Sequence, residues 1–185
     1  MKPLSYDLEE VNKLFTEKKI LDLRGIGNRL IRESALTNDY GKAELGVIAY
    51  ALHKIETKSH FVKNPKWGQV KQAITLHLNE AENAAREEDQ KKFLSSLKTV
   101  IQSIVNIDNE LGNFAQNIYD KAKVKQASLA YSYGLSIAQS AALTGADQKE
   151  LQSYIGFTTM HDEEPDEKNI SQRVNELKDL LDTGR

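Results

Sequence analysis

Four polar side chains close together in the sequence could contact the bases and phosphates of a nucleic acid. They are Gln148, Lys149, Gln152 and Ser153. A glutamine amide can form two hydrogen bonds with adenine, and lysine and serine can reach bases or phosphates. The helical period places the four residues on one face of a helix. Such a face would present a reading surface to a groove of the nucleic acid.

The segment that would position these residues, Ser136–Gly156, reads as two short helices joined by a tight turn. A small residue, Ala141, is followed four positions later by Gly145 and six positions after that by Leu151. This spacing resembles that of a DNA-reading helix-turn-helix, in which the second helix enters the major groove. The resemblance implies that the polar residues of the second helix contact nucleic acid.

The surroundings of this segment leave two interpretations open. Three lysines just upstream could support nucleic-acid binding: Lys121, Lys123 and Lys125. A plain helical hairpin closed by a glycine is the alternative, and Asp147 and Glu150 lower the local positive charge. The segment Ala138–Asp162 is also similar to helical tails of uncharacterised archaeal proteins and of antitoxin-like regulators. That similarity implies no particular activity.

A second candidate for phosphate contact is the segment Leu23–Asn28. It is similar to the hairpin of helix-hairpin-helix domains, in which a Gly-apolar-Gly turn offers backbone N–H groups to a phosphate. The resemblance implies that Gly25 and Gly27 form the turn. The apolar spacing of Leu30, Ile31 and Ala35 separately predicts a second helix after Gly25 or Gly27. Arg24 and Arg29 would lie beside the phosphate, although Arg24 stands where the family usually has proline. The alternative is a simple tight bend between two helices.

Histidines and glutamates at helical spacing form a possible metal site. The candidates are His53, Glu56, His60, His77 and Glu80. The first three would share one helical face, and the last two repeat the His-x-x-Glu pattern on a following helix. Facing helices could supply imidazole and carboxylate ligands, but carboxylate-bridged bundles use the reverse order, Glu-x-x-His. A solvated polar face is the alternative, and we expect no bound cofactor.

Composition excludes several classes of protein. The formal net charge of −2 argues against a general polyanion binder, so any nucleic-acid contact must be local. The absence of cysteine excludes disulfides, thiolate metal sites and cysteine nucleophiles. No catalytic signature or cofactor loop is present, and no apolar run approaches the roughly 20 residues of a membrane span. We therefore expect a soluble, cytoplasmic binding protein without catalytic activity.

Apolar residues recur at helical spacing almost throughout the chain. A first helix follows Ser5 and Asp7, which could cap its N-terminus. The run Ala43–Ile55 is apolar on more than one face, which predicts a central helix. Trp67 should anchor a later helix, and Asp89 should begin another. We expect an all-α fold, an antiparallel helical bundle with a C-terminal helical hairpin and a trailing amphipathic helix.

The chain divides into four predicted parts. They are a bundle core at 1–133, a hairpin packed on it at 134–157, an acidic linker at 158–168 and an amphipathic helix at 169–185. That last helix could dock on its own core, on another subunit or on another helical protein. The leading hypothesis is a nucleic-acid-associated or regulatory adaptor that binds DNA or RNA through a local patch. The competing function is a protein-protein scaffold or oligomerisation module, and a helical metal-binding protein is a third possibility.

Overall fold

The computed structural model describes residues 3–110 and 118–162, and within these ranges all regular structure is helical. The all-α prediction is confirmed for the described residues. The helices are α1 (Leu4–Thr16), α2 (Ile20–Thr37), α3 (Tyr40–Glu56), α4 (Ser59–Val62), α5 (Trp67–Arg86), α6 (Gln90–Glu110), α7 (Ile118–Ser132), α8 (Ile137–Thr144) and α9 (Gln148–Asp162). The predicted C-terminal helix at 169–185 lies outside the described residues.

The chain divides into two units, Met1–Gln152 and Ser153–Arg185. The first unit contains α1 to α8 and the beginning of α9. The described part of the second unit is the rest of α9, which continues to Asp162. The segment 158–162, which we expected to be the start of an acidic linker, is therefore helical. The remainder of that linker lies outside the described residues.

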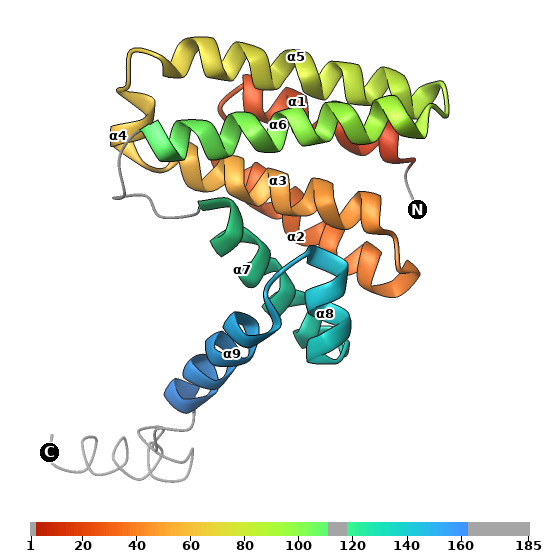
Figure 1. The fold of residues 1–185 in the computed structure, drawn as a ribbon, viewed down its shortest axis with the longest axis vertical. Helices are drawn as coiled ribbons and strands as arrows, with labels where there is room; N and C mark the ends of the chain where they lie inside the picture. Colours follow the sequence, from red (N-terminus) through yellow and green to blue (C-terminus); the bar gives the residue numbers. More distant parts are fainter. Residues whose placement is uncertain (1–2, 111–117, 163–185) are drawn as a thin grey trace, which may run out of the picture. The chain divides into compact units, whose positions relative to one another are not determined.

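Helix α3 is the central helix of the first unit. In Figure 1 it lies between the paired helices α5 and α6 on one side and α7 on the other. It also contacts α1, α2, α4 and α8. Its apolar side chains are fully buried, among them Leu45, Ile48, Leu52 and Ile55. A helix that is apolar on several faces needs neighbours on several sides. The prediction of a central helix at Ala43–Ile55 is confirmed.

The contact between α2 and α3 depends on two glycines. A Cβ atom added to Gly27 would lie 3.0 Å from the carbonyl oxygen of Gly46 and 3.4 Å from the backbone nitrogen of Tyr50. A Cβ atom added to Gly46 would lie 3.1 Å from the carbonyl oxygen of Gly27. The missing side chains therefore let the two helix backbones approach closely. The predicted turn at Gly25 and Gly27 is wrong, because both glycines lie inside the uninterrupted helix α2.

Side-chain caps and aromatic packing fix several helix ends. Asp39 Oδ1 accepts a hydrogen bond from the backbone N–H of Lys42 at 3.0 Å and so caps α3. Asp89 Oδ1 accepts one from the N–H of Lys92 at 3.0 Å, just before α6. Trp67 begins α5, and its ring packs edge-on against Phe15 at 6.2 Å between ring centroids. The predictions for Trp67 and Asp89 are confirmed.

The N-terminus of α1 differs from the prediction. The helix begins at Leu4 with Pro3 at the N-cap position and without a side-chain cap. Proline suits a helix start because its missing N–H would have no partner within the helix. Ser5 and Asp7 lie inside the helix, so the prediction that they cap it is wrong.

Asp7 instead belongs to a buried network of charges that joins α1, α2 and α3. Its Oδ1 atom lies 3.0 Å from Arg29 Nη2 and its Oδ2 atom 3.3 Å from Lys42 Nζ. Lys42 Nζ also lies 2.7 Å from Glu33 Oε2. Burial alone would lower the pKa of Lys42 and raise that of Glu33, but their hydrogen bond and opposite charges reverse both shifts. Both groups are therefore held in their charged forms.

Candidate nucleic-acid interface

Both ends of α8 are fixed by local hydrogen bonds. At its start, the Ser136 hydroxyl accepts from the backbone N–H of Gln139 at 3.2 Å, and the Gln139 side chain accepts from the N–H of Ser136 at 2.9 Å. This reciprocal capping box defines the first turn of the helix. At its end, Gly145 has a φ of +68°, a left-handed conformation that favours glycine. The sequence therefore encodes a short helix with two defined ends.

Asp147 positions the start of α9. Its Oδ1 atom accepts hydrogen bonds from the backbone N–H groups of Lys149 and Glu150, each at 2.9 Å. Its backbone carbonyl accepts from the N–H of Leu151 at 3.0 Å. Residues 145–147 thus form a three-residue turn between α8 and α9, at the position that the sequence predicts.

The residues of α8 and of the start of α9 divide into a buried set and an exposed set. Ala141 of α8 is 6% exposed and Leu151 of α9 is fully buried. Ser140, Leu143 and Thr144 of α8 are also buried, and α8 packs against α7, α3 and α2. The polar residues predicted to contact nucleic acid are all exposed: Gln148, Lys149, Gln152 and Ser153. The start of α9 therefore presents a polar surface on a helix held by buried apolar residues.

The charge at the start of α9 is mixed. Lys149 is positive, whereas Asp147 and Glu150 are negative. The carboxylate of Asp147 is engaged by two backbone N–H groups of the helix N-terminus, where a negative charge is stabilised. The exposed side chains that remain for a partner are one cation, one anion, two amides and a hydroxyl. Such a surface can form hydrogen bonds to bases, but it supplies little of the charge that phosphates need.

The three lysines upstream of the α8–α9 segment differ in how accessible they are to a phosphate. Lys121 is exposed on α7. Lys123 Nζ lies 3.0 Å from Asp120 Oδ1 and 4.9 Å from the centroid of the Tyr119 ring, so an acidic residue already balances its charge. Lys125 is half-buried. Of the three, Lys121 is the most available to an external phosphate.

The second predicted phosphate site is not formed. Because α2 is continuous through Gly25 and Gly27, its backbone N–H groups there are used within the helix instead of facing a ligand. Arg29 is half-buried and bonds Asp7, Glu10 and Glu33, each at 3.0 Å. Arg24 is exposed on α2. The prediction of a hairpin that binds phosphate is therefore wrong.

The predicted metal ligands are not brought together. His53 is buried, and its Nδ1 atom lies 2.9 Å from the carbonyl oxygen of Ile20. Burial lowers the pKa of His53, the hydrogen bond to Ile20 opposes this shift, and the charges of Lys54 and Arg24 add to it. Because a carbonyl oxygen can only accept a hydrogen bond, Nδ1 is the donor. This hydrogen bond joins the end of α3 to the start of α2.

The other four candidates have separate partners. Glu56 Oε1 is 2.8 Å from Lys71 Nζ, and His77 Nδ1 is 2.8 Å from Glu80 Oε2 on the same helix. The exposed ring of His60 packs beside a neighbouring aromatic ring. Among residues 3–107 and 118–158, whose side chains the structure describes, no three His, Asp or Glu side chains are arranged to hold a metal ion. The predicted ligand set is therefore wrong, because each member is oriented by a different contact.

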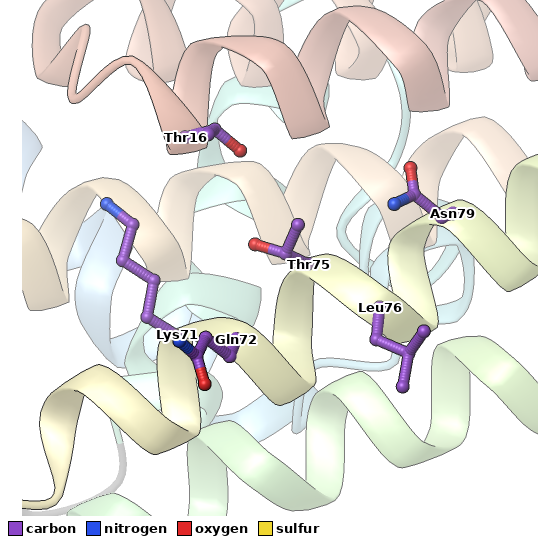
Figure 2. Close-up of a pocket in the computed structure, with 6 residues that line it drawn as sticks. All are labelled: Thr16, Lys71, Gln72, Thr75, Leu76 and Asn79. Carbon is purple, nitrogen blue, oxygen red and sulfur yellow. The ribbon is translucent and has the colours of Figure 1, made fainter.

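An open groove of about 390 Å³ runs between α1 and α5 (Figure 2). Its lining residues are Thr16, Lys71, Gln72, Thr75, Leu76 and Asn79. Lys71 is held by its ion pair with Glu56 and by the ring of Phe15, whose centroid is 4.5 Å from Nζ. The lining includes no carboxylate or histidine that could act as a general base. The groove therefore does not assemble a catalytic group with its base.

The sequence interpretation overlooked a basic surface around α4. Exposed or half-exposed lysines follow one another at Lys54, Lys58, Lys63 and Lys66. The signal in the sequence is the segment 57–79, which contains no Asp or Glu. Three of the four lysines named above lie in it, and its other lysine, Lys71, is paired with Glu56. The low net charge of the whole chain masked this local excess.

The comparisons with known proteins assign no family. No protein-family model, no curated protein and no solved structure matches the chain. In the part of the chain that the structure describes, no helix combines the length and the apolar character needed to cross a membrane. The function is therefore inferred from the residues and contacts described above.

Proposed function

We propose that this protein is a binding protein that contacts double-stranded DNA through the exposed start of α9. The observation that carries the proposal is the separation of buried and exposed residues in the α8–α9 segment. Ala141 and Leu151 are buried, while Gln148, Lys149 and Gln152 are exposed on the helix that follows the turn. A helix-turn-helix uses this division, because its first helix is held by the protein and the start of its second helix enters the major groove.

Each exposed side chain has a defined role in this proposal. Gln148 and Gln152 carry amides that can both donate to and accept from an adenine edge. Lys149 contacts a phosphate and sets the position of α9 on the duplex. Ser153, one residue further along the helix, supplies a hydroxyl that can reach a base or a phosphate. The carboxylate of Asp147 keeps the helix start ordered while these groups face outward.

The mixed charge of α9 predicts modest affinity that depends on salt. Phosphate contacts release counterions, so each one steepens the fall of log K with log salt by about 0.9. Lys149 makes one phosphate contact and should therefore contribute about 0.9 to this slope. The amides should contribute a preference for particular base sequences more than affinity. The protein should bind random-sequence DNA with a dissociation constant in the micromolar range, which is typical of binding without a preferred sequence.

The test is fluorescence anisotropy with a labelled duplex of about 30 base pairs of random sequence, measured at several salt concentrations. We expect the double variant Lys149→Ala/Gln152→Ala to bind more weakly than the unmodified protein. Its salt slope should be smaller by about one, since one phosphate contact is lost.

The matched control is Lys98→Ala/Gln102→Ala on α6, where both side chains are also exposed. This variant removes the same residue types and the same charge from a different helix, so it should bind like the unmodified protein. Equal binding by both variants would contradict the proposal for α9. Absence of DNA binding by the unmodified protein would favour the protein-scaffold function.

A further inference from the structure

Three lysines around α4 form a surface that the α9 proposal does not use. Lys54 lies in the last turn of α3, Lys58 at the N-cap position of α4 and Lys63 at its C-cap position. We call these three residues the lysine patch. The segment 57–79, which includes Lys58 and Lys63, contains no acidic residue. Lys54 lies two residues before Glu56, whose carboxylate is paired with Lys71. The acidic residue nearest in sequence to the patch is therefore already engaged.

Two tertiary contacts bring another segment to the same end of the bundle. The hydrogen bond from His53 to the carbonyl of Ile20 joins the end of α3 to the start of α2. The ring contact between Phe15 and Trp67 joins the end of α1 to the start of α5. The segment 16–24, which runs from the end of α1 into the beginning of α2, therefore lies near the lysine patch.

The segment 16–24 carries both basic and acidic residues. Lys18, Lys19 and Arg24 are exposed, and so are Glu17 and Asp22. Lys19 is paired with Glu17, with 2.7 Å between Nζ and Oε2. Arg24 lies one helical turn after Ile20, whose carbonyl is bonded to His53 at the end of α3. With three cations and two anions, the segment 16–24 adds a formal charge of +1 to this end of the bundle.

The three lysines of the patch lack ion pairs within the described chain, as do other exposed lysines such as Lys91, Lys92 and Lys98. Lys54, Lys58 and Lys63 form no ion pair with a described residue, and Lys54 only approaches the ring of Tyr50, at 5.5 Å. Arg86, by contrast, pairs with two glutamates, and Lys71 and Arg29 are paired with buried or half-buried carboxylates. The charges of the patch are therefore available to a partner outside the chain.

The backbone beneath the patch is well anchored. Phe61 of α4 is fully buried, and its N–H donates to the carbonyl of Lys58 at 3.0 Å. The N–H of Lys63 donates to the carbonyl of Ser59 at 3.0 Å. The lysines thus project from a short ordered segment, so binding requires only the side chains to become ordered.

We propose that the lysine patch binds the phosphate backbone of a double-stranded nucleic acid without reading its sequence. Lysines act as point charges toward phosphates, whereas arginines would form the bidentate contacts typical of specific recognition. Lys54 lies in the last turn of α3, and Lys58 and Lys63 lie at the two ends of α4, so the positive charges are spread over two helices and not gathered around a single anion. This proposal does not depend on α9.

A lipid surface is the main competitor for the same charges. Peripheral membrane helices combine basic residues with a broad apolar face. At this end of the bundle the exposed large apolar side chains of the described chain are Leu21 and Val62, and α4 is only one turn long. The observations therefore favour a nucleic acid, and anionic vesicles become one arm of the test.

The test compares three full-length proteins in anisotropy titrations with the random-sequence duplex of about 30 base pairs over a range of salt concentrations. The variant Lys54→Gln/Lys58→Gln/Lys63→Gln should bind at least about tenfold more weakly at low salt, and its salt slope should fall by about three. The variant with arginine at the same three positions should retain binding, because the charges are kept.

The matched control is Lys91→Gln/Lys92→Gln/Lys98→Gln on α6, three exposed lysines on the helix that follows Glu87–Asp89. It changes the net charge by the same amount and should bind DNA nearly as the unmodified protein does. Equal weakening by the control and the patch variant would overturn the proposal, since net charge alone would then explain the effect. Unchanged binding by the patch variant would also overturn it.

Two further results separate this proposal from its alternatives. If the patch variant loses binding to phosphatidylserine-containing vesicles while DNA binding is unchanged, the partner is a membrane and the proposal fails. If Lys149→Ala/Gln152→Ala binds DNA normally while the patch variant does not, the proposal for α9 fails and the lysine patch is supported. The opposite pattern supports α9 and overturns the patch.

Discussion

The carbonyl oxygen of Gly46 would lie 3.0 Å from a Cβ atom placed on Gly27, so α2 and α3 are in contact through their backbones. Both glycines are buried within helices. Glycine in a helix interior costs up to about 1 kcal/mol relative to alanine, and close packing of two helices offsets that cost here. The contact fixes α2 against the central helix of the first unit.

Two glycines of α2 separated by one residue should respond in opposite ways to alanine. Gly27→Ala forces a methyl group against the backbone of α3 and should lower the free energy of unfolding by about 1–3 kcal/mol. Gly25→Ala meets no atom within 4 Å. It should raise the free energy of unfolding by up to about 1 kcal/mol through helix propensity. Urea denaturation followed by circular dichroism measures both, and equal effects would contradict the α2–α3 contact.

The buried charge network predicts strong coupling between Asp7 and Lys42. Lys42→Met leaves the carboxylate of Asp7 without one of its two cations in a fully buried position. Removal of one member of a buried pair typically costs about 3–5 kcal/mol. The double variant Asp7→Asn/Lys42→Met should cost less than the sum of the two single variants, because no buried charge at position 7 then lacks a partner. Additive effects in a double-mutant cycle would disprove the coupling.

His53 should make stability depend on pH near neutrality. Burial lowers its pKa in the folded protein below the ordinary value of about 6.5. The unfolded chain therefore binds the proton first as pH falls, so stability is full above about pH 6.5 and is lost as pH decreases. The positive charges that face the imidazole, Lys54 and Arg24, act in the same direction.

The measurement is the free energy of unfolding from about pH 7.5 to about pH 5.5, compared between the unmodified protein and His53→Asn. The asparagine amide can still donate to the carbonyl of Ile20, but it does not titrate. The pH dependence should therefore be shallower in the variant. An unchanged profile would show that other groups cause the dependence.

The α8–α9 turn predicts a gain in DNA binding from one conservative change. In Asp147→Asn the side chain still accepts from the start of α9, since Asn and Asp are comparable N-caps. The loss of one negative charge beside Lys149 should raise DNA affinity at low salt about two- to fivefold, as expected for one surface charge. The melting temperature should change little. Weaker DNA binding by this variant would contradict the position of α9 on the duplex.

Local sequence patterns predicted the helices better than they predicted the contacts and roles of individual residues. The periodicity of Ala43–Ile55 was sufficient to predict a central helix, because a helix apolar on several faces has few alternatives. The glycine pair around Gly27 was ambiguous, because a bend and a close helix contact require the same residue. Only the neighbouring Gly46, distant in sequence, decides between them.

In the candidate sites too, local features were predicted correctly and contacts between distant residues were not. Gly145 and Asp147 specify the α8–α9 turn through local conformation and capping, and the sequence predicted that turn correctly. The histidine candidates failed because the partner of His53 is the backbone of Ile20, a contact that spacing within one helix cannot indicate. The basic surface around α4 is local in the sequence, but the low net charge of the whole chain obscured it.

The absence of cysteine permits a direct test of the position of α9. Gln152→Cys on α9 and Gln102→Cys on α6 can each be labelled with a benzophenone photocrosslinker and irradiated with the random-sequence duplex. We predict crosslinks to DNA from position 152 and few from position 102, because only α9 is proposed to enter the groove. Equal crosslinking from both positions, or crosslinking from position 102 alone, would contradict the proposed function.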